Sequence, residues 1–443
     1  MKNEKVFKKL MELVAIKSVS TDDARYHEIL KAVAFLKDWL EEIGCQIKII
    51  THDQAPPMLI GIKKVERAKK TIGIYGHYDV QPEDPVDEWL SPPFQLTAKE
   101  GRFYGRGVAD NKGHIVQNLD AVDYLIKSNR LTNNIFFIFE GEEETGSLHF
   151  EEYINKAKDL LGKVDIFYLT DVGMYQKNKP QIFYALRGLI PFELNVVVGG
   201  HDLHSGVYGN KVFNPINVVA SLLAKIKDVN SGEILIPGFY KDVKQLAKPE
   251  LSLLKKTIKP ANQEKREAGV FQLTTIRKSP FSLSSKIFPS FDCHGIISGY
   301  TGAGVKTVIP RSAKVKFSFR LVEYQKPRDI KELVGNFIEK NLPTGVKYRL
   351  TVYKGNPPFY TDINNDSVVN TAKILSAVFQ NKTIFNRSGG SVPAAEVLQR
   401  VFQKPIILTG FTLSDGNIHA PNENFNEEMF WKGIEALKAI YSN

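Results

Sequence analysis

The chain has 443 residues, 43% of them hydrophobic and 24% charged, which is typical of a soluble globular protein with two or three domains. Its two cysteines, Cys45 and Cys293, are too few for a disulfide framework, so we expect a reducing compartment, the cytoplasm. The formal net charge is +10, but basic stretches such as 63–70 are short and mixed with glutamate, which favours a solvated surface over nucleic-acid binding. Residues 1–20 resemble an amphipathic helix rather than a secretory signal, and no apolar run approaches the roughly 20 residues of a membrane span.

Residues 1–185 are predicted to alternate between helices and strands. Residues 27–44 place Ile29, Val33 and Leu36 on one helical face and end at Gly44, a favourable C-terminal cap. Short, almost entirely apolar runs are typical of parallel strands buried on both faces. Four such runs occur, at 71–75, 134–139, 164–169 and 404–411, and a helical pattern lies between the first two at 115–126. This alternation predicts an α/β domain.

The middle of the chain has a different pattern. A strand at 192–199 precedes a helix near 214–227, and the run 313–322 alternates strictly between apolar and polar residues. A helix at 328–340 and a strand at 347–353 follow. We therefore predict an α+β domain at 187–365, inserted into an α/β domain formed by 1–186 and 366–443.

Charged and imidazole side chains follow each of the apolar runs. His77 and Asp79 come after the first run, glutamates at 140–144 after the second, and Asp171 after the third. A loop after the fourth run reaches Asp415 and His419, and a glycine-rich turn at 105–113 contains Asp110. Taken alone, the segment 140–147 is better explained as an exposed acidic turn, and Asp171 as a helix cap. The ligand crevice of an open α/β sheet lies at the carboxyl ends of its strands, so together these residues indicate one site.

Several carboxylates in one crevice repel one another unless cations neutralise them. Two histidines with three carboxylates suit two divalent cations of the zinc type, with one carboxylate bridging them. Asp79 could accept the other ring N–H of His77 and fix its orientation. The sequence lacks a phosphate-binding loop, a complete dinucleotide fingerprint, the H-E-x-x-H motif and the G-x-S-x-G motif, so those site classes are excluded.

Eight segments carry a resemblance to a known family: GHYDVQP (76–82), GRGVADNKG (105–113), EGEEETGS (140–147), YALRG (184–188), DLHSGVYG (202–209), TVIP (307–310), GGSVPA (389–394) and His419. In combination and order they resemble the M20 family of metallopeptidases, and most closely its cytosolic nonspecific dipeptidase and carnosinase branch. The resemblance implies a dizinc catalytic domain interrupted by a ferredoxin-like lid domain through which two copies form a homodimer.

The resemblance also implies roles for individual residues. The implied metal ligands are His77, Asp110, Glu144, Asp171 and His419, with Asp110 bridging. Glu143 matches the general base and Asp79 the residue that orients His77, which leaves Glu140 and Glu142 as supporting or solvated groups. His204 matches a donor to the oxyanion, and Thr307, Arg320 and Ser391 match positions that hold the carboxyl-terminal part of the substrate. The alternative for Arg320 is an exposed charge of the lid.

The implied reaction is hydrolysis of a dipeptide by a metal-bridged water with Glu143 as general base, and the implied cofactors are two divalent ions per chain, Zn²⁺ or else Mn²⁺ or Co²⁺. An N-acyl-amino-acid deacylase of the same family, of the desuccinylase or deacetylase kind, is the alternative, and an inactive binding protein is a third reading. The partners we expect are a small peptide and a second copy of the chain, without nucleic acid or membrane. Asn111 and His114 depart from the family pattern, and His114 could alter substrate choice. The lysine-rich segment 241–269 indicates nothing about specificity.

Overall fold

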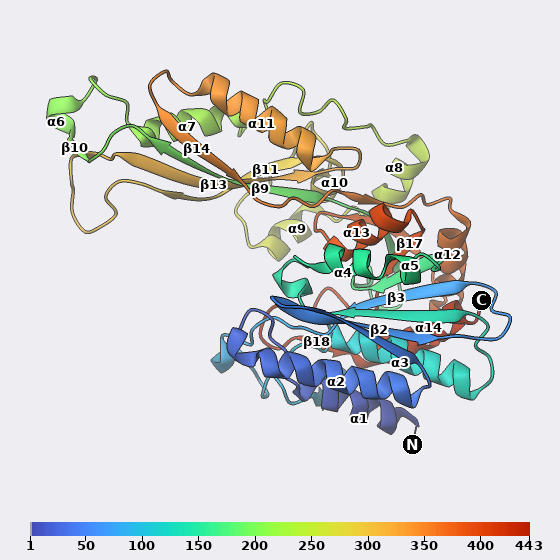
Figure 1. The fold of residues 1–443 in the computed structure, drawn as a ribbon. Helices are drawn as coiled ribbons and strands as arrows, with labels where there is room; N and C mark the ends of the chain where they lie inside the picture. The colour runs from blue at the N-terminus through green and yellow to red at the C-terminus, as the bar shows by residue number, and fades with distance from the viewer. Residues whose placement is uncertain (1) are drawn as a thin grey trace. The chain divides into compact units, whose positions relative to one another are not determined.

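The structure is a computed structural model that describes residues 2–443, and the chain forms two compact units (Figure 1). Unit 1 contains the residues up to Tyr184 together with Thr361–Asn386 and Val392–Asn443, and unit 2 contains Ala185–Tyr360 and Arg387–Ser391. The chain therefore crosses between the units four times. The roles predicted for 1–186 with 366–443 and for 187–365, as catalytic domain and lid, stay predictions. Among residues 2–443, no helix is both long and apolar enough to cross a membrane.

Unit 1 is built on a mixed sheet with the strand order β1-β2-β6-β3-β7-β17-β8-β15, in which β15 (Phe359–Tyr360) pairs with the end of β8 that belongs to unit 2, and a further strand, β16, pairs with β8. The strands are β1 (Gln46–His52), β2 (Ala55–Lys63), β3 (Thr71–His77), β6 (Asn134–Glu140), β7 (Ile166–Thr170), β8 (Gln181–Leu186), β16 (Ile384–Ser388) and β17 (Ile406–Thr409). The four strands predicted from apolar runs, β6, β3, β7 and β17, pair in parallel at its centre. Their burial confirms the α/β class, because every residue of β3 and β7 is buried.

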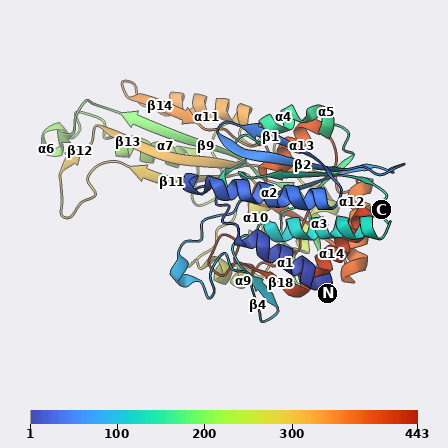
Figure 2. The ribbon, with the colours of Figure 1, turned by 60° about the horizontal axis from the view of Figure 1, so that its bottom comes forward.

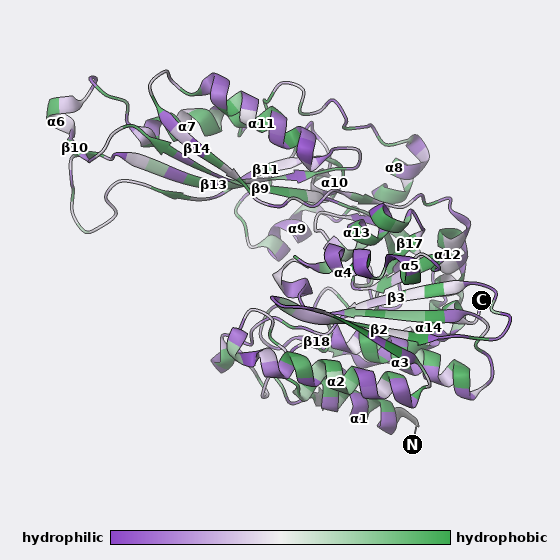
Figure 3. Cartoon of the chain, in the orientation of Figure 1, coloured by the Kyte–Doolittle hydropathy of each residue, from purple (hydrophilic) through white to green (hydrophobic). Residues whose placement is uncertain are grey.

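Helices cover both faces of this sheet (Figures 1 and 2). One layer is α1 (Lys2–Ala15), α2 (Tyr26–Glu42), α3 (Lys112–Lys127), α12 (Asp366–Phe379) and α14 (Glu427–Tyr441). The other layer is α4 (Phe150–Lys156), α5 (Lys158–Leu161) and α13 (Pro393–Phe402). In Figure 3, α2 carries both hydrophobic and hydrophilic residues, and its buried side chains include the predicted Ile29, Val33 and Leu36. A small sheet of β18 (Asn424–Asn426), β5 (Arg102–Tyr104) and β4 (Thr97–Lys99) completes unit 1.

Unit 2 has a four-stranded antiparallel sheet in the order β11-β13-β9-β14. Its strands are β9 (Gly188–Val197), β11 (Ser290–Ile297), β13 (Ser312–Leu321) and β14 (Lys347–Val352). The alternating residues of β9 and β13 bury one face, on which Phe192 stacks on Phe317 at 5.2 Å. The helices α7 (Pro215–Ile226) and α11 (Pro327–Asn341) pack on that face. This two-layer arrangement matches the predicted α+β domain.

The remaining elements of unit 2 are short. They are β10 (Leu203–His204), α6 (Ser205–Tyr208), α8 (Lys248–Lys255), α9 (Ala261–Ala268), α10 (Phe281–Ile287), β12 (Val308–Ile309) and β15 (Phe359–Tyr360). The segment 387–391 packs into unit 2 through Arg387. The side chain of Arg387 is 1% exposed, and its guanidinium pairs with Glu323 at 2.7 Å and with Glu250 of α8. Within the unit, the backbone N–H of Arg187 donates to the carbonyl oxygen of Gly390 at 3.1 Å.

Candidate dinuclear metal site

Three parallel strands of unit 1 end at one edge of the sheet and deliver polar side chains there. His77 is the last residue of β3 and lies in register with Glu140, the last residue of β6. A short 3₁₀ turn after β6 carries Glu143 and Glu144, and Asp171 follows β7 directly. Parallel strands expose their carboxyl ends at the same edge, so sequence positions that are far apart become neighbours.

Two further residues reach the same edge from loops. Asp110 precedes α3, and His419 lies in the loop between β17 and β18 with a φ of 64°. A left-handed conformation is uncommon for a residue other than glycine and tends to occur at functional positions, where the surroundings hold it. Asp415, which the sequence pattern placed beside His419, is not in the cluster, because its carboxylate pairs with Arg102 at 2.7 Å.

The cluster consists of two groups that share Asp110. The Nε2 atom of His77 lies 3.0 Å from Oδ1 of Asp110 and 3.4 Å from Oδ1 of Asp171. The Nε2 atom of His419 lies 3.1 Å from Oδ2 of Asp110 and 3.1 Å from Oε2 of Glu144. Each oxygen of Asp110 therefore faces a different imidazole, and each imidazole also lies close to a different second carboxylate.

The separations fit two cations of the zinc type. Such a cation holds nitrogen and oxygen ligands at about 2.0–2.2 Å in a tetrahedral arrangement, which places neighbouring ligand atoms roughly 3.4 Å apart. The imidazole–carboxylate distances of 3.0–3.4 Å in both groups are close to that value. His77, Asp110 and Glu144 also offer ligand atoms that all lie within 4.8 Å of one another. The donor set thus suits two divalent cations, with Asp110 between them.

The pKa values of the clustered residues also indicate a site for cations. Burial lowers the pKa of His77, but Asp171 and Asp110 outweigh that effect and hold it well above its ordinary value. Hydrogen bonds to Asp110 and Glu144 raise the pKa of His419 to about 10, and burial raises the pKa of Asp171 to about 6. In the protein alone, protons on the imidazoles balance the buried carboxylates. A divalent cation competes with these protons, since metal binding requires neutral imidazole.

Asp79 connects His77 to the loop that carries the two glutamates. Its carboxylate is buried, lies 3.3 Å from Nδ1 of His77, and accepts hydrogen bonds from the backbone N–H groups of Glu143 and Glu144 at 3.3 and 3.0 Å. The hydroxyl of Ser20 donates to it at 2.7 Å. Nδ1 of His77 is closer, at 3.1 Å, to the backbone oxygen of Asp79. Asp79 therefore faces Nδ1 of His77 with two acceptors, its backbone oxygen and its carboxylate, and its role in orienting that ring stays a prediction.

Glu143 precedes Glu144 in the 3₁₀ turn after β6 and lies near enough to the cluster for the charges of His77, Asp171 and Asp110 to act on it. Burial raises its pKa well above the ordinary value, against the effect of His77 and together with the nearby Asp171 and Asp110. A carboxylate with a raised pKa is suited to take up a proton near neutral pH. Its position in the structure is compatible with the role of general base, which stays a prediction.

The other two glutamates of the motif are buried supports. Glu140 is 1% exposed and accepts hydrogen bonds from Tyr75 at 2.6 Å and Ser147 at 3.0 Å. Burial raises its pKa to about 8. Glu142 is 3% exposed and accepts from Nδ1 of His149 at 2.9 Å. Of the two readings that the sequence left open for these residues, supporting or solvated, the structure selects the first.

Three polar residues that orient the cluster were not recognised as such from the sequence. Glu423 is buried and accepts four hydrogen bonds from the loop that ends in Asp110, and burial raises its pKa against the opposing effect of Arg106. The amide of Asn111 donates to Asp171 at 2.7 Å. The amide of Gln81 donates to Glu144 at 2.8 Å. Of these three residues, only Asn111 could have been singled out from the sequence, because it directly follows the predicted ligand Asp110.

His114 is a buried structural residue. Its ring is 1% exposed, its Nε2 atom accepts a hydrogen bond from the backbone N–H of Phe411 at 3.1 Å, and it packs against Phe425. Burial lowers its pKa to about 4, so the ring is neutral. A buried ring cannot touch a substrate directly, so an effect on substrate choice would have to act through its neighbours.

The four residues predicted to bind substrate all lie in unit 2. His204 is exposed and its Nδ1 atom accepts the backbone N–H of Gly206 at 3.0 Å, which leaves the Nε2 atom as donor in the neutral ring. Thr307 adjoins β12, where its carbonyl oxygen accepts from the N–H of Ser205 at 3.2 Å. Arg320 is half-buried on β13, and burial lowers its pKa. Ser391 ends the segment 387–391.

Comparison with known proteins decides the family. Residues 73–443 match the model of peptidase family M20/M25/M40. The chain belongs to this family. This M20 peptidase is 29% identical over 449 residues to human Beta-Ala-His dipeptidase, an alignment that covers 98% of this chain and 88% of the relative. It is 31% identical over 454 residues to Cys-Gly metallodipeptidase DUG1 of Candida albicans, with coverage of 98% and 93%.

Solved structures agree with the fold. The M20 family metallo-carboxypeptidase Sso-CP2 from Sulfolobus solfataricus superimposes with a TM-score of 0.89 at 31% identity, covering 99% of this chain and 98% of the other. Human carnosine dipeptidase 1 gives a TM-score of 0.80 at 28% identity, with coverage of 99% and 95%. The predicted family, fold class and metallopeptidase class of this chain are confirmed.

Proposed function

We propose that this M20 peptidase hydrolyses dipeptides with the help of two divalent cations. The observation that carries the proposal is the pair of imidazole–carboxylate groups that share Asp110, with Glu143 beside them. Relatives named as dipeptidases, aligned over nearly their whole length, support the reaction class. The ligands we propose are His77, Asp110, Glu144, Asp171 and His419. We propose zinc for both ions, with manganese or cobalt as alternatives.

Individual residues have different roles in the proposed reaction. The cations, when bound, supply Lewis acidity toward an amide carbonyl and make water more acidic. Glu143 takes the proton from the attacking water on its carboxylate and passes it to the leaving amine. Asp79 holds His77 and, through the backbone of the glutamate loop, fixes where Glu143 lies. His204 donates a hydrogen bond from Nε2 to the oxyanion.

Substrate binding is proposed for unit 2. Arg320 holds the carboxylate of the carboxyl-terminal residue, assisted by Thr307 and Ser391. No carboxylate of residues 2–443 lies within 4.0 Å of the Arg320 guanidinium, so this half-buried charge has no ion-pair partner among those residues. That makes an exposed lid charge the weaker explanation. A panel of free and N-acylated dipeptides, each with a free or amidated carboxyl end, distinguishes the dipeptidase from the deacylase.

We further propose that two copies pair through unit 2 and that the protein is cytoplasmic. Unit 2 exposes several apolar side chains near α6 and α7, among them Val207, Tyr208 and Phe213, which are 52%, 40% and 49% exposed. Exposed apolar patches of this kind commonly mark protein–protein contacts. The cytoplasmic location rests on the cysteine content, with Cys45 and Cys293 both free.

Exchange of the two adjacent glutamates tests the proposed chemistry. Glu143→Gln should keep both cations yet lose hydrolysis by several orders of magnitude, because the proton acceptor and the proton donor vanish together. Glu144→Gln should lower the metal content instead. Metal analysis and dipeptide turnover measure the two effects, and Glu66→Gln, an exposed glutamate far along the chain, serves as the matched control. Full activity of Glu143→Gln, or unchanged metal content in Glu144→Gln, contradicts the assignment.

A further inference from the structure

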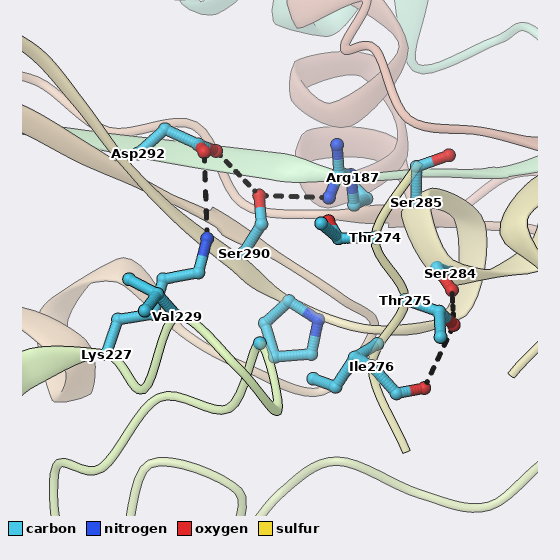
Figure 4. A pocket seen from close by; sticks show the side chains of 12 residues that line it. Arg187, Lys227, Val229, Thr274, Thr275, Ile276, Ser284, Ser285, Ser290 and Asp292 are labelled. Atoms are coloured by element: carbon cyan, nitrogen blue, oxygen red, sulfur yellow. Dashed lines mark hydrogen bonds and ion pairs between the residues drawn. The ribbon is translucent and has the colours of Figure 1, made fainter. Parts of the chain in front are cut away.

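Unit 2 contains a pocket of about 510 Å³ that the roles described so far do not use (Figure 4). It is lined by the start of β11 and the turn before β9, by the loop that follows α7, by the segment 274–276 and by the middle of α10. Charged groups and hydroxyls line much of it, including Arg187, Lys227, Ser290 and Asp292. A concave site with a few convergent polar groups is the usual form of a ligand-binding pocket.

Arg187 brings to the pocket a positive charge that forms no ion pair with a carboxylate among residues 2–443. Its Nε atom donates to the carbonyl oxygen of Gly389 at 3.0 Å and its Nη1 atom to the hydroxyl of Ser290 at 3.2 Å. Its acceptors are two carbonyl oxygens and one hydroxyl, all neutral, and within residues 2–443 no carboxylate lies within 4.0 Å of its guanidinium. Burial and the nearby Arg320 lower its pKa to about 10, so the group remains charged at neutral pH. A part-buried cation of this kind favours an anionic ligand.

The other charges around the pocket leave this excess in place. The carboxylate of Asp292 lies 4.0 Å from Nζ of Lys227 and accepts a hydrogen bond from Ser290, so one negative charge faces one lysine. Asp292 also acts against burial by raising the pKa of both Arg187 and Arg320. The pocket therefore contains a guanidinium, that of Arg187, without an ion-pair partner among residues 2–443.

The register of the sheet places Arg320 beside this pocket. Ser290 of β11 is directly opposite Arg320 of β13, and Arg320 is directly opposite Leu189 of β9. Residues directly opposite on antiparallel strands point to the same face, with Cβ atoms about 5 Å apart. Phe291 and Phe319 alternate with them and are buried on the other face. Arg320 thus emerges on the face where Ser290 lines the pocket, near enough to Arg187 for its charge to lower the pKa of that guanidinium.

We propose that this pocket receives the side chain of the substrate's carboxyl-terminal residue and prefers a carboxylate there, as in dipeptides that end in glutamate or aspartate. The inference rests on the proposed function, in which Arg320 binds the main-chain carboxylate of that residue. With the main-chain carboxylate on Arg320, the adjoining side chain reaches toward the guanidinium of Arg187. A second carboxylate supplies the charge that the pocket lacks.

The test compares Ala-Glu with Ala-Gln, which have nearly the same shape and differ by one charge. The wild-type protein should show a kcat/KM about tenfold higher for Ala-Glu, the effect of one charge-assisted hydrogen bond in a partly open site. Arg187→Met should reduce that ratio to within about twofold, and Arg187→Lys should keep part of it. Asp292→Asn should raise the ratio, because it removes the opposing carboxylate. The ratio cancels any general loss of activity, since both substrates suffer it equally.

Lys347→Met is the matched control. It removes one positive charge from unit 2 at the far end of β9, where Lys347 pairs with Val197, nine residues from Gly188. Its Ala-Glu to Ala-Gln ratio should equal that of the wild type. Equal kcat/KM values for the two dipeptides in the wild-type protein overturn the pocket proposal and leave the proposed function standing. If neither dipeptide is hydrolysed by the metal-loaded protein, the proposed function fails and this inference fails with it.

Discussion

Glu423 is the residue whose replacement should most clearly reveal how the metal loop is held. One oxygen of its carboxylate accepts from Arg106 at 2.7 Å and from the N–H of Gly107 at 2.9 Å, and the other accepts from the N–H groups of Ala109 and Asp110 at 2.8 and 3.0 Å. In Glu423→Gln one acceptor oxygen becomes an NH₂ donor, so two of these four bonds are lost whichever way the amide points. At about 1.5–3 kcal/mol for each bond to a charged group, the loss is roughly 3–6 kcal/mol.

That range agrees with the roughly 3–5 kcal/mol expected when one partner of a buried ion pair is removed, and both groups of the Arg106–Glu423 pair are 1% exposed. For a unit of this size it corresponds to a fall in Tm of about 10 °C. Calorimetry of the protein in a metal chelator measures this fall, and metal titration should show weaker binding because Asp110 is no longer fixed.

The exposed pair of Arg102 and Asp415 provides the control. Its carboxylate is 61% exposed, so Asp415→Asn should cost no more than about 1 kcal/mol. If Glu423→Gln melts within about 2 °C of the wild type, or no lower than Asp415→Asn, the argument that the buried carboxylate organises the loop is refuted.

Two further predictions concern the site and the assembly. Asn111→Asp replaces the amide donor that lies 2.7 Å from Asp171 by a second carboxylate. The free energy of unfolding of the metal-free protein at pH 7, measured with a denaturant, should therefore fall by about 1–3 kcal/mol. An unchanged free energy of unfolding would show that this hydrogen bond is dispensable. Sedimentation of the chain should give twice its mass of 49.9 kDa, and Phe213→Asp should shift it toward the monomer. A wild-type protein that sediments as a monomer at all concentrations contradicts the proposed pairing.

The central strands could be predicted from the sequence because their signal is local. Apolar runs such as 71–75 and 164–169 are too short for core helices and became β3 and β7. From parallel strands it follows that the residues after them share an edge, which is why His77 and Asp171 were expected together and lie 3.4 Å apart. Their role as metal ligands stays a prediction, as do the domain roles.

The supporting contacts could not be predicted, because they join distant parts of the chain through side chains with no local pattern. Glu423 lies 317 positions from Arg106, and nothing in its neighbourhood distinguishes it from a solvated glutamate. Asp415 was expected at the site from its sequence position but does not lie there. It stands in the loop that carries His419, yet it pairs with Arg102, because the side-chain direction in an irregular loop is fixed by tertiary contacts.

The segment 387–391 determines whether unit 2 can be produced as an isolated fragment. Unit 2 draws on a second, remote stretch of chain, so a fragment of 185–360 made alone would contain Glu323 and Glu250 without the guanidinium of Arg387 that both of them bind. Two largely buried carboxylates would then face each other with no cation between them, which is strongly destabilising. A stable fragment would have to restore these five residues, for instance as a linked peptide. The two units are therefore separate as compact bodies but not as pieces of sequence.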